Sequence, residues 1–437
     1  MTLLDELIDW LRIPSVSTGE GDSRELERAG GWVVERVRGA GGDADLVTVD
    51  GGHPLAVGEL RAATADAPTV LVYGHYDVQS PGPAELWTSP PFEPTVRGDR
   101  LYARGASDDK GNFLPLLHVA CALARDGALP VNVRVLVEGE EEVGGESVGR
   151  WLRADERGAD AAIVFDAGGE DPDVPTVTVG LRGLVQLHVR VRTGERDLHS
   201  GLYGGAALNA AHVLHAMLAA VVPAPGHRVR DELRAGIAEP PPAERASWER
   251  LKPGERVLGD VGARPTDPRA AAEFYERNWA DASLDVNEVV TGEPRTVIPV
   301  TASATVALRL APRQRAADIA PVLEGLLRDA APPGADIEVE ANLADSALFD
   351  VDDPVLRLAG EALERATGAE TLFIRSGGSI PIVADLADRG IPTVVSGFAV
   401  PDDRIHAPDE SYRLRSLELG EAAARELFRA LGSLHQS

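Results

Sequence analysis

The sequence Thr69-Val-Leu-Val-Tyr-Gly-His-Tyr-Asp77 joins a continuous apolar run to a histidine and an aspartate. Such a run predicts a strand that is covered on both faces. His75 follows its carboxyl end, the end at which ligands bind in open α/β sheets. Apolar runs at 131–137 and 161–165 repeat this pattern, because the first leads into Glu140-Glu-Glu142 and the second into Asp166. We therefore expect one sheet edge to carry an imidazole and several carboxylates.

Segments with the apolar spacing of helices separate these strands, which indicates a mostly parallel, helix-covered sheet of the α/β class. The first predicted helix runs from Leu3 to the Ile13-Pro14 pair, and others cover 23–37, 112–125, 354–366, 380–389 and 415–431. Further strands are expected at 44–49, 55–60 and 393–396. Ser23 is the expected N-cap of the second helix, and Pro115 is expected in the first turn of the third.

The pattern changes in the middle of the chain. Residues 184–192 alternate apolar and polar side chains, which predicts a strand with one solvated face. A helix at 206–221, strands at 283–291 and 302–310, a helix at 313–331 and a strand at 337–341 complete a β-α-β-β-α-β order, the ferredoxin-like arrangement. We predict a discontinuous first domain of residues 1–182 and 346–437 with a smaller domain, 183–345, inserted into it. The smaller domain holds a long segment at about 223–280 in which no motif is recognisable.

The composition limits the possible partners. The formal charge of −27, from 70 acidic and 43 basic residues, argues against nucleic acid or an anionic membrane as a partner. The N-terminal segment reads as an amphipathic acidic helix, and no apolar run approaches the roughly 20 residues that a membrane-spanning helix needs. We expect a cytoplasmic protein. Cys121 is the single cysteine, so no intramolecular disulfide can form, and its apolar surroundings predict a buried, inert thiol.

With one cysteine, any metal must be held by histidine and carboxylate side chains, which favours zinc or manganese. His75 is a candidate ligand with Asp77 behind it to fix its tautomer, although a surface His–Asp pair would look the same. In Asp108-Asp109-Lys110-Gly111 a carboxylate could bridge two cations, or simply favour a helix N-terminus. The Glu140–142 run could be a solvated loop, or could supply both a ligand and a general base. His406 lies in a polar loop before the last helix, and His199 lies in a glycine-rich loop where backbone can approach a ligand.

Taken together, these motifs resemble peptidase family M20, and within it the carnosinase-like dipeptidases. The matching segments, in chain order, are His75-x-Asp77, Arg104-Gly-x-x-Asp-Asp-Lys-Gly111, Glu138-Gly-x-Glu-Glu-x-Gly144, Asp197-Leu-His-Ser-Gly-x-Tyr-Gly-Gly205, Thr296-Val-Ile-Pro299, Arg375-Ser-Gly-Gly-Ser-Ile-Pro381 and the late His406. They span nearly the whole chain. The resemblance implies a zinc-exopeptidase-like catalytic domain and an inserted lid that is often used to form a homodimer.

The resemblance also implies roles. Asp108 would bridge two divalent cations, most simply zinc, with manganese or cobalt as alternatives. One cation would take Asp108, Glu142 and His406, and the other would take His75, Asp108 and Asp166. Glu141 would be the general base that activates a bridging water. The Asp108–Asp109 peptide bond would be cis.

For the substrate, the resemblance implies that His199 of the lid stabilises the oxyanion, from across a dimer interface. Thr296 and Arg309 match lid positions that contact substrate, and Gly378 and Ser379 match positions near its C-terminal carboxylate. The implied activity is hydrolysis of dipeptides or short peptides. The alternatives are a deacylase of the same family that cleaves N-acyl amino acids, and a non-catalytic relative that only binds peptides.

Overall fold

The computed structural model describes residues 2–19, 21–169, 171 and 173–436. The chain forms two compact units. The first comprises the residues up to Val179, Phe349–Phe373 and those from Pro381 onward; the second comprises Gly180–Leu348 and Ile374–Ile380. The units thus change at 179/180 and 348/349, whereas the predicted domains change at 182/183 and 345/346. The second unit also includes a short segment, 374–380, that the prediction assigns to the first domain.

The sheet of the first unit has a parallel centre. Its strands follow the order β1 (Asp43–Val47), β2 (Leu55–Leu60), β6 (Asn132–Glu138), β3 (Thr69–His75), β7 (Ala161–Phe165), β17 (Thr393–Ser396) and β8 (Thr176–Leu181). β6, β3, β7 and β17 are parallel neighbours, whereas β1, β2 and β8 pair antiparallel. Every residue of β7 and β17 is buried, as a strand covered on both faces requires. The predicted α/β class and its mostly parallel sheet centre are confirmed.

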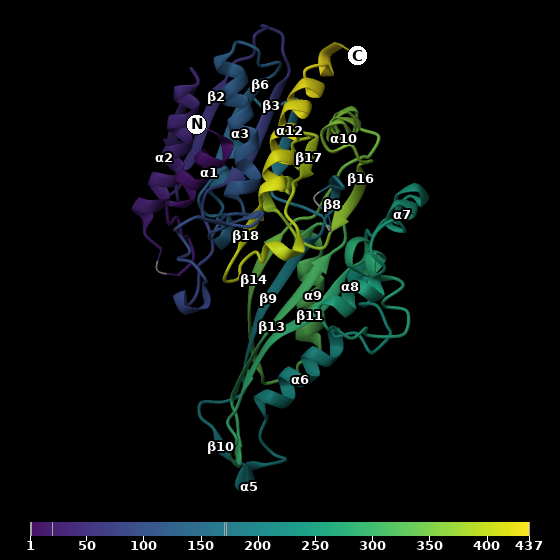
Figure 1. Cartoon of the computed structure of the whole chain (residues 1–437). Coiled ribbons are helices and arrows are strands. Elements are labelled where there is room, and N and C mark those ends of the chain that lie inside the picture. The colour runs from purple at the N-terminus through teal and green to yellow at the C-terminus, as the bar shows by residue number, and fades with distance from the viewer. Residues whose placement is uncertain (1, 20, 170, 172, 437) are drawn as a thin grey trace. The chain divides into compact units, whose positions relative to one another are not determined.

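Helices α1 (Leu3–Leu11), α2 (Ser23–Gly39), α3 (Lys110–Arg125), α4 (Ser147–Ala154), α10 (Pro354–Thr367), α11 (Pro381–Asp388) and α12 (Leu414–Leu431) complete this unit. Figure 1 shows the closing helix α12 beside α3, which it contacts. Short 3₁₀ turns lie at Ala84–Leu86, Glu141–Val143, Pro401–Asp403 and Leu434–Gln436. Among the residues that the structure describes, every helix is too short or too polar to cross a bilayer.

The N-cap of α2 and the start of α3 differ from the prediction. Asp22, not Ser23, caps α2, because its side chain accepts a hydrogen bond from the Arg24 amide. Helix α3 begins at Lys110, two residues earlier than expected, so Pro115 lies inside the helix and not in its first turn. The earlier start places the first turn of α3 directly after the Asp108–Asp109 pair.

A small sheet that the sequence did not predict connects distant parts of the first unit. It consists of β18 (Ser411–Arg413), β5 (Arg100–Tyr102) and β4 (Thr95–Arg97), in that order. Ser411 pairs with Tyr102 in its antiparallel register. Because β18 and β5 are neighbours, the loop before β18 lies beside the turn that follows β5.

The second unit has the predicted β-α-β-β-α-β order. Its antiparallel sheet runs β11 (Ser283–Thr291), β13 (Thr301–Leu310), β9 (Gly183–Arg192) and β14 (Asp336–Ala344). Helices α6 (Ala210–Val221) and α9 (Ala316–Asp329) pack on it, and their apolar side chains share a core with the buried alternate residues of the strands. Figure 1 shows both helices along the long strands of this sheet.

The remaining elements of the second unit are short. β10 (Leu198–His199) pairs with β12 (Val297–Ile298) next to α5 (Ser200–Tyr203). β15 (Ala347–Leu348) pairs with Leu181 and Gly180, and β16 (Leu372–Ser376) pairs with β8. The 223–280 segment holds a 3₁₀ turn at Asp231–Arg234, α7 (Pro242–Trp248), α8 (Gly254–Asp260) and a π-helical turn at Glu276–Ala280.

Candidate metal centre

Five segments of the first unit bring their polar side chains to one place. His75 is the last residue of β3, and Asp108 lies in the turn before α3. Glu141 and Glu142 form the short turn after β6, and Asp166 directly follows β7. His406 lies in the loop between β17 and β18. The parallel strands therefore deliver their side chains to a common edge, as their carboxyl ends predict.

Asp108 lies between the two histidines. Its Oδ1 is 3.0 Å from Nε2 of His75, and its Oδ2 is 3.0 Å from Nε2 of His406. Nε2 of His406 is also 3.1 Å from Oε2 of Glu142. Two groups have ligand atoms that all lie within 4.8 Å of one another, His75 with Asp108 and Asp166, and Asp108 with Glu142 and His406. Asp108 is the member that they share, and the implied cis peptide bond follows it.

Burial and like charge shift the pKa values of this cluster. Burial, and then the charge of Asp108, raise the pKa of Asp166 well above its usual value. Burial, with Glu142 and Asp108 adding repulsion, raises the pKa of Glu141 to about 7. Hydrogen bonds with Asp108 and Glu142 raise the pKa of His406 to about 10. Carboxylates that are crowded in a poorly solvated place need a compensating positive charge.

A buried carboxylate oxygen of Glu142 that lacks a hydrogen-bond partner indicates whether cations fit this cluster. Oε1 of Glu142 is buried and has no hydrogen-bond partner, whereas Oε2 accepts a hydrogen bond from Nε2 of Gln79 at 2.9 Å. A buried carboxylate oxygen without a partner is costly unless a cation or a donor meets it. Imidazole and carboxylate donors suit zinc, manganese or cobalt. The residues present therefore fit a pair of divalent cations with Asp108 between them.

Asp77 supports two parts of the cluster. Nδ1 of His75 lies 3.0 Å from the carbonyl oxygen of Asp77 and 3.4 Å from its carboxylate. The carboxylate itself accepts hydrogen bonds from the amides of Glu141 and Glu142, at 3.3 and 3.1 Å, and from Oγ of Ser17 at 2.7 Å. The nearer contact to the imidazole is thus a backbone carbonyl, and the side chain holds the turn that carries both glutamates.

Glu410 is a residue that sequence reasoning missed. Its fully buried carboxylate accepts hydrogen bonds from the amides of Gly105, Ser107 and Asp108, at 2.9, 2.9 and 3.1 Å, and from Nη1 of Arg104 at 2.6 Å. One side chain from the His406 loop therefore fixes the backbone of the turn that presents Asp108. The sequence contains both partners, but 302 residues separate Asp108 from Glu410.

The His406 loop is held in an unusual backbone conformation. Arg404, His406 and Asp409 have positive φ values of 58°, 60° and 60°, a region that is disfavoured for residues other than glycine. Asp409 accepts hydrogen bonds from the amide and hydroxyl of Thr88, at 2.9 and 2.7 Å. Asp403 accepts one from Oγ of Ser107 at 2.9 Å. These side chains stabilise the conformation that presents His406.

The five other predicted site residues lie in the second unit, where they form two separate groups. Nη1 of Arg309 donates to Oγ of Ser379 at 3.2 Å, one residue after Gly378. At the other end of β13, the carbonyl oxygen of Thr296 accepts hydrogen bonds from Ser200, the residue after His199. β13 runs from Thr301 to Leu310, so roughly 25 Å of strand separates the two groups.

Comparisons with known proteins point to one family. The model of peptidase family M20/M25/M40 matches residues 71–430. The cysteinylglycine-S-conjugate dipeptidase of Corynebacterium striatum is 31% identical over 422 residues, which cover 93% of this chain and 90% of that relative. The chain belongs to peptidase family M20/M25/M40. Membership identifies it as a metallopeptidase, and the matched region contains every predicted metal ligand.

Other relatives agree with this assignment. The human β-Ala-His dipeptidase is 25% identical over 87% of this M20 peptidase and 78% of its own length. The crystal structure of an M20 family metallo-carboxypeptidase from Sulfolobus solfataricus superposes with a TM-score of 0.88 at 26% identity, covering 99% of this chain and 100% of that one. The structure of human carnosine dipeptidase 1 has the same fold, with a TM-score of 0.78 at 23% identity. The resemblance found in the motifs is confirmed at the level of the family.

Proposed function

We propose that this M20 peptidase hydrolyses dipeptides or short peptides that have a free C-terminal carboxylate. The observation that carries the proposal is Asp108, whose two carboxylate oxygens each face the imidazole of a different ligand group. Its relatives include dipeptidases named for Cys-Gly conjugates and for β-Ala-His, and the Sulfolobus solfataricus relative is named a carboxypeptidase. All three kinds of enzyme cleave next to a C-terminal residue.

In this proposal the protein holds two zinc ions. His75, Asp108 and Asp166 hold one of them, and Asp108, Glu142 and His406 hold the other. When bound, the ions would polarise the scissile carbonyl and make a water molecule more acidic. Asp77 orients His75 and the turn of Glu141 and Glu142.

Glu141 is the proposed general base. Its carboxylate takes a proton from the attacking water and passes it to the nitrogen of the leaving amine as the C–N bond breaks. A pKa raised to about 7 by burial lets Glu141 accept and return a proton near neutral pH. The turn that carries it is fixed by two amide hydrogen bonds to Asp77, which keeps the base in place through the reaction.

The substrate's carboxylate is assigned to the group around Arg309. A guanidinium can bind a carboxylate through two hydrogen bonds. Ser379 adds a hydroxyl, and Gly378 lets the backbone approach the ligand closely. The 376–379 loop, of which Gly378 is exposed and the other residues are half-buried, is thus proposed to select peptides by their C-terminal end.

We propose that His199 and Thr296 act on the substrate bound by a second copy of the chain. Roughly 25 Å of β13 separates them from Arg309, too far for one lid to place both groups on one dipeptide. Nδ1 of His199 accepts a hydrogen bond from the Gly201 amide at 3.1 Å, so the neutral ring carries its proton on Nε2 and can donate it to an oxyanion. Exposed apolar side chains at Leu202 and Tyr203 adjoin His199 and suit a homodimer contact.

These residue roles assign a function to each predicted domain. Residues 1–182 and 346–437 form the proposed catalytic domain, and 183–345 form the proposed lid and dimerisation domain. A cytoplasmic location, and the absence of nucleic-acid and membrane partners, stay predictions from the sequence.

A substrate panel with metal analysis tests the proposal. Purified enzyme would be assayed with cysteinylglycine, β-alanylhistidine and other dipeptides, with a tripeptide, and with N-acetyl and N-succinyl amino acids. We expect dipeptides to be cleaved fastest and close to two zinc ions per chain. Turnover of acyl amino acids alone would instead identify the deacylase branch. Metal bound without any turnover would favour the non-catalytic alternative.

A further inference from the structure

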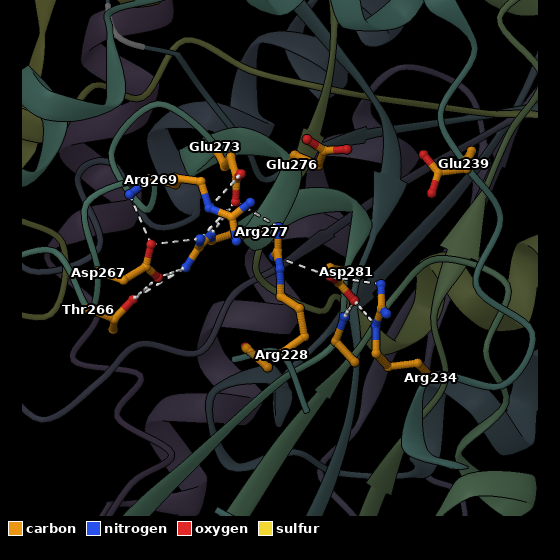
Figure 2. Close-up of polar contacts among 12 residues, drawn as sticks. Arg228, Arg234, Glu239, Thr266, Asp267, Arg269, Glu273, Glu276, Arg277 and Asp281 are labelled. Carbon is orange, nitrogen blue, oxygen red and sulfur yellow. Dashed lines mark hydrogen bonds and ion pairs between the residues drawn. The ribbon is translucent and has the colours of Figure 1, made fainter. Parts of the chain in front are cut away.

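The 223–280 segment, which has no recognisable motif, is stabilised by ion pairs between its charged side chains. Arg277 pairs with Asp267 and with Glu273, in the latter case at 2.7 Å. Asp281 pairs with Arg234 at 2.9 Å and with Arg228 at 3.2 Å (Figure 2). Arg277 lies within the π-helical turn Glu276–Ala280, and Asp281 directly follows it, so ion pairs fix both the turn and its end. A short irregular turn that is fixed in this way can hold a side chain in a defined position.

Two contacts connect this segment to the chain before the 376–379 loop. Glu244 of α7 accepts two hydrogen bonds from Arg375, at 2.5 and 2.8 Å, and both side chains are buried. Ile374 packs on a small apolar cluster that includes Trp248 and Trp279. The insertion therefore contacts and stabilises β16, the strand that leads into the loop carrying Gly378 and Ser379.

Arg182 forms hydrogen bonds with the loop itself, and Asn278 holds the side chain of Arg182. Nε of Arg182 donates to the carbonyl oxygen of Gly377 at 3.2 Å, and Nη2 donates to Oδ1 of Asn278 at 2.9 Å. The backbone amide of Arg182 lies 3.3 Å from the carbonyl oxygen of Ser376 and 3.1 Å from that of Gly378. Three consecutive carbonyl groups of the loop therefore meet donors from one residue.

Asn278 packs so closely against residue 377 that only glycine fits there. A Cβ atom built on Gly377 would lie 2.7 Å from Oδ1 of Asn278 and 3.1 Å from its Nδ2, closer than carbon normally approaches. Any larger residue at 377 would displace Asn278 or shift the loop. A Cβ atom on the second glycine, Gly378, would lie 3.6 Å from Oγ of Ser376, which is an ordinary contact, so only Gly377 is constrained in this way.

The charges around the loop are unbalanced. No carboxylate lies within ion-pair distance of Arg182 or Arg309 in the part of the chain that the structure describes. Arg182 is only 6% exposed, and burial together with the charge of Arg309 lowers its pKa to about 10. Asp285 and Asp281 offset part of this charge from a distance, but among the described residues neither guanidinium has a direct ion pair, so an anionic ligand would be favourable at this loop.

We propose that Arg182 and Asn278 are positioning residues that determine how the 376–379 loop binds the substrate's C-terminal carboxylate, and that the 223–280 insertion supplies their support. The inference rests on the proposed function, because it takes the loop as the carboxylate site. It adds that Asn278, which need not touch the substrate, controls specificity for a free carboxylate by fixing Arg182 and Gly377.

The test compares Asn278→Ala with wild type on cysteinylglycine and on its C-terminal amide. The matched control is Asn342→Ala, an exposed asparagine on β14 of the same unit. We expect kcat/KM for the free carboxylate to fall roughly tenfold to a hundredfold, mainly through KM, as for one misplaced hydrogen bond to a charged group. For the C-terminal amide of cysteinylglycine, which lacks the negative charge, kcat/KM should fall less than for the free acid. The inference is overturned if both substrates lose equally or if neither changes.

Hydrogen exchange of the metal-loaded protein provides a second readout that needs no activity. In Asn278→Ala the backbone amides of residues 376–380 should exchange faster than in wild type, while those of Asn342→Ala should not. Unchanged exchange in this loop would overturn the inference even if dipeptides are cleaved. If wild type cleaves no dipeptide, the proposed function fails, and the exchange result alone then decides whether the insertion holds the loop.

Discussion

Glu141 is the side chain on which the proposed chemistry depends. We expect Glu141→Ala to lower kcat by roughly 10²- to 10⁴-fold, the usual contribution of a general base. Metal content should stay the same, because Glu142 and not Glu141 belongs to the ligand groups. Steady-state kinetics and elemental analysis of the purified variant test this. Glu146→Ala, an exposed glutamate of the same segment, is the control, and retained turnover in Glu141→Ala would disprove the assigned mechanism.

Cys121 is expected to be inert in the folded protein. Its side chain is 3% exposed, and burial raises its pKa to about 12. The thiol therefore stays protonated at pH 8, where a thiol-specific reagent should react with it far more slowly than in unfolded protein. Because the folded pKa is the higher one, its contribution to stability is complete below about pH 9 and declines as pH rises toward 12.

Denaturant provides the control for this prediction. The unfolded chain should take up one equivalent of reagent, because Cys121 is the single cysteine. Rapid labelling of native protein at pH 8 would show that the thiol is accessible and would contradict the buried position.

At the scale of elements, the loop before β18 and the turn before α3 behave as one structure because Glu410 connects them. We expect Glu410→Gln to weaken metal binding by roughly 10- to 100-fold, as is typical when a group supporting a ligand is lost. The amide keeps the shape of the side chain but brings its NH₂ group toward backbone amides that also donate. Competition with a chelator of known affinity measures the effect.

A comparison of metal-free proteins separates positioning from folding. Glu418→Gln, on the exposed face of α12, is the matched control. If metal-free Glu410→Gln is less stable but binds metal as tightly as wild type, Glu410 supports only the fold. Thermal unfolding without metal makes this distinction.

Elements with long apolar patterns were predicted well, and short ones were missed. The strands 55–60, 161–165 and 393–396 have the predicted bounds, because each has a mostly buried apolar centre. β4, β5 and β18 have three residues each, which is too short for a period to be recognised. They matter for the site, since they bring Glu410 to the turn before Asp108.

At the scale of the whole molecule, the proposed dimer makes a prediction about mixed subunits. Glu141→Ala and His199→Ala would each be nearly inactive alone. If His199 acts on the partner's substrate, a co-expressed mixture should regain roughly a quarter of wild-type activity, because half of the dimers are mixed and each has one complete site. Activity assays of the purified mixture, with sedimentation to establish the dimer, measure this.

The opposite arrangement gives a different result. If His199 served the site of its own chain, each site would need Glu141 and His199 from the same chain. Every chain in the mixture lacks one of these two residues, so the mixture would stay inactive. A monomer in sedimentation would also rule out the shared site.

The sequence by itself determined the α/β class, the β-α-β-β-α-β order and the candidate ligands, from His75 to His406. The elements follow from apolar periodicity within short windows, whereas the choice of ligands follows from the resemblance of the motifs to peptidase family M20. Only the tertiary structure decided that Asp108 lies between two histidines, that Glu410 fixes its turn, and that Arg182 and Asn278 hold the 376–379 loop. Those contacts join residues up to some 300 positions apart, and no local pattern encodes which buried carboxylate or guanidinium will meet which backbone group.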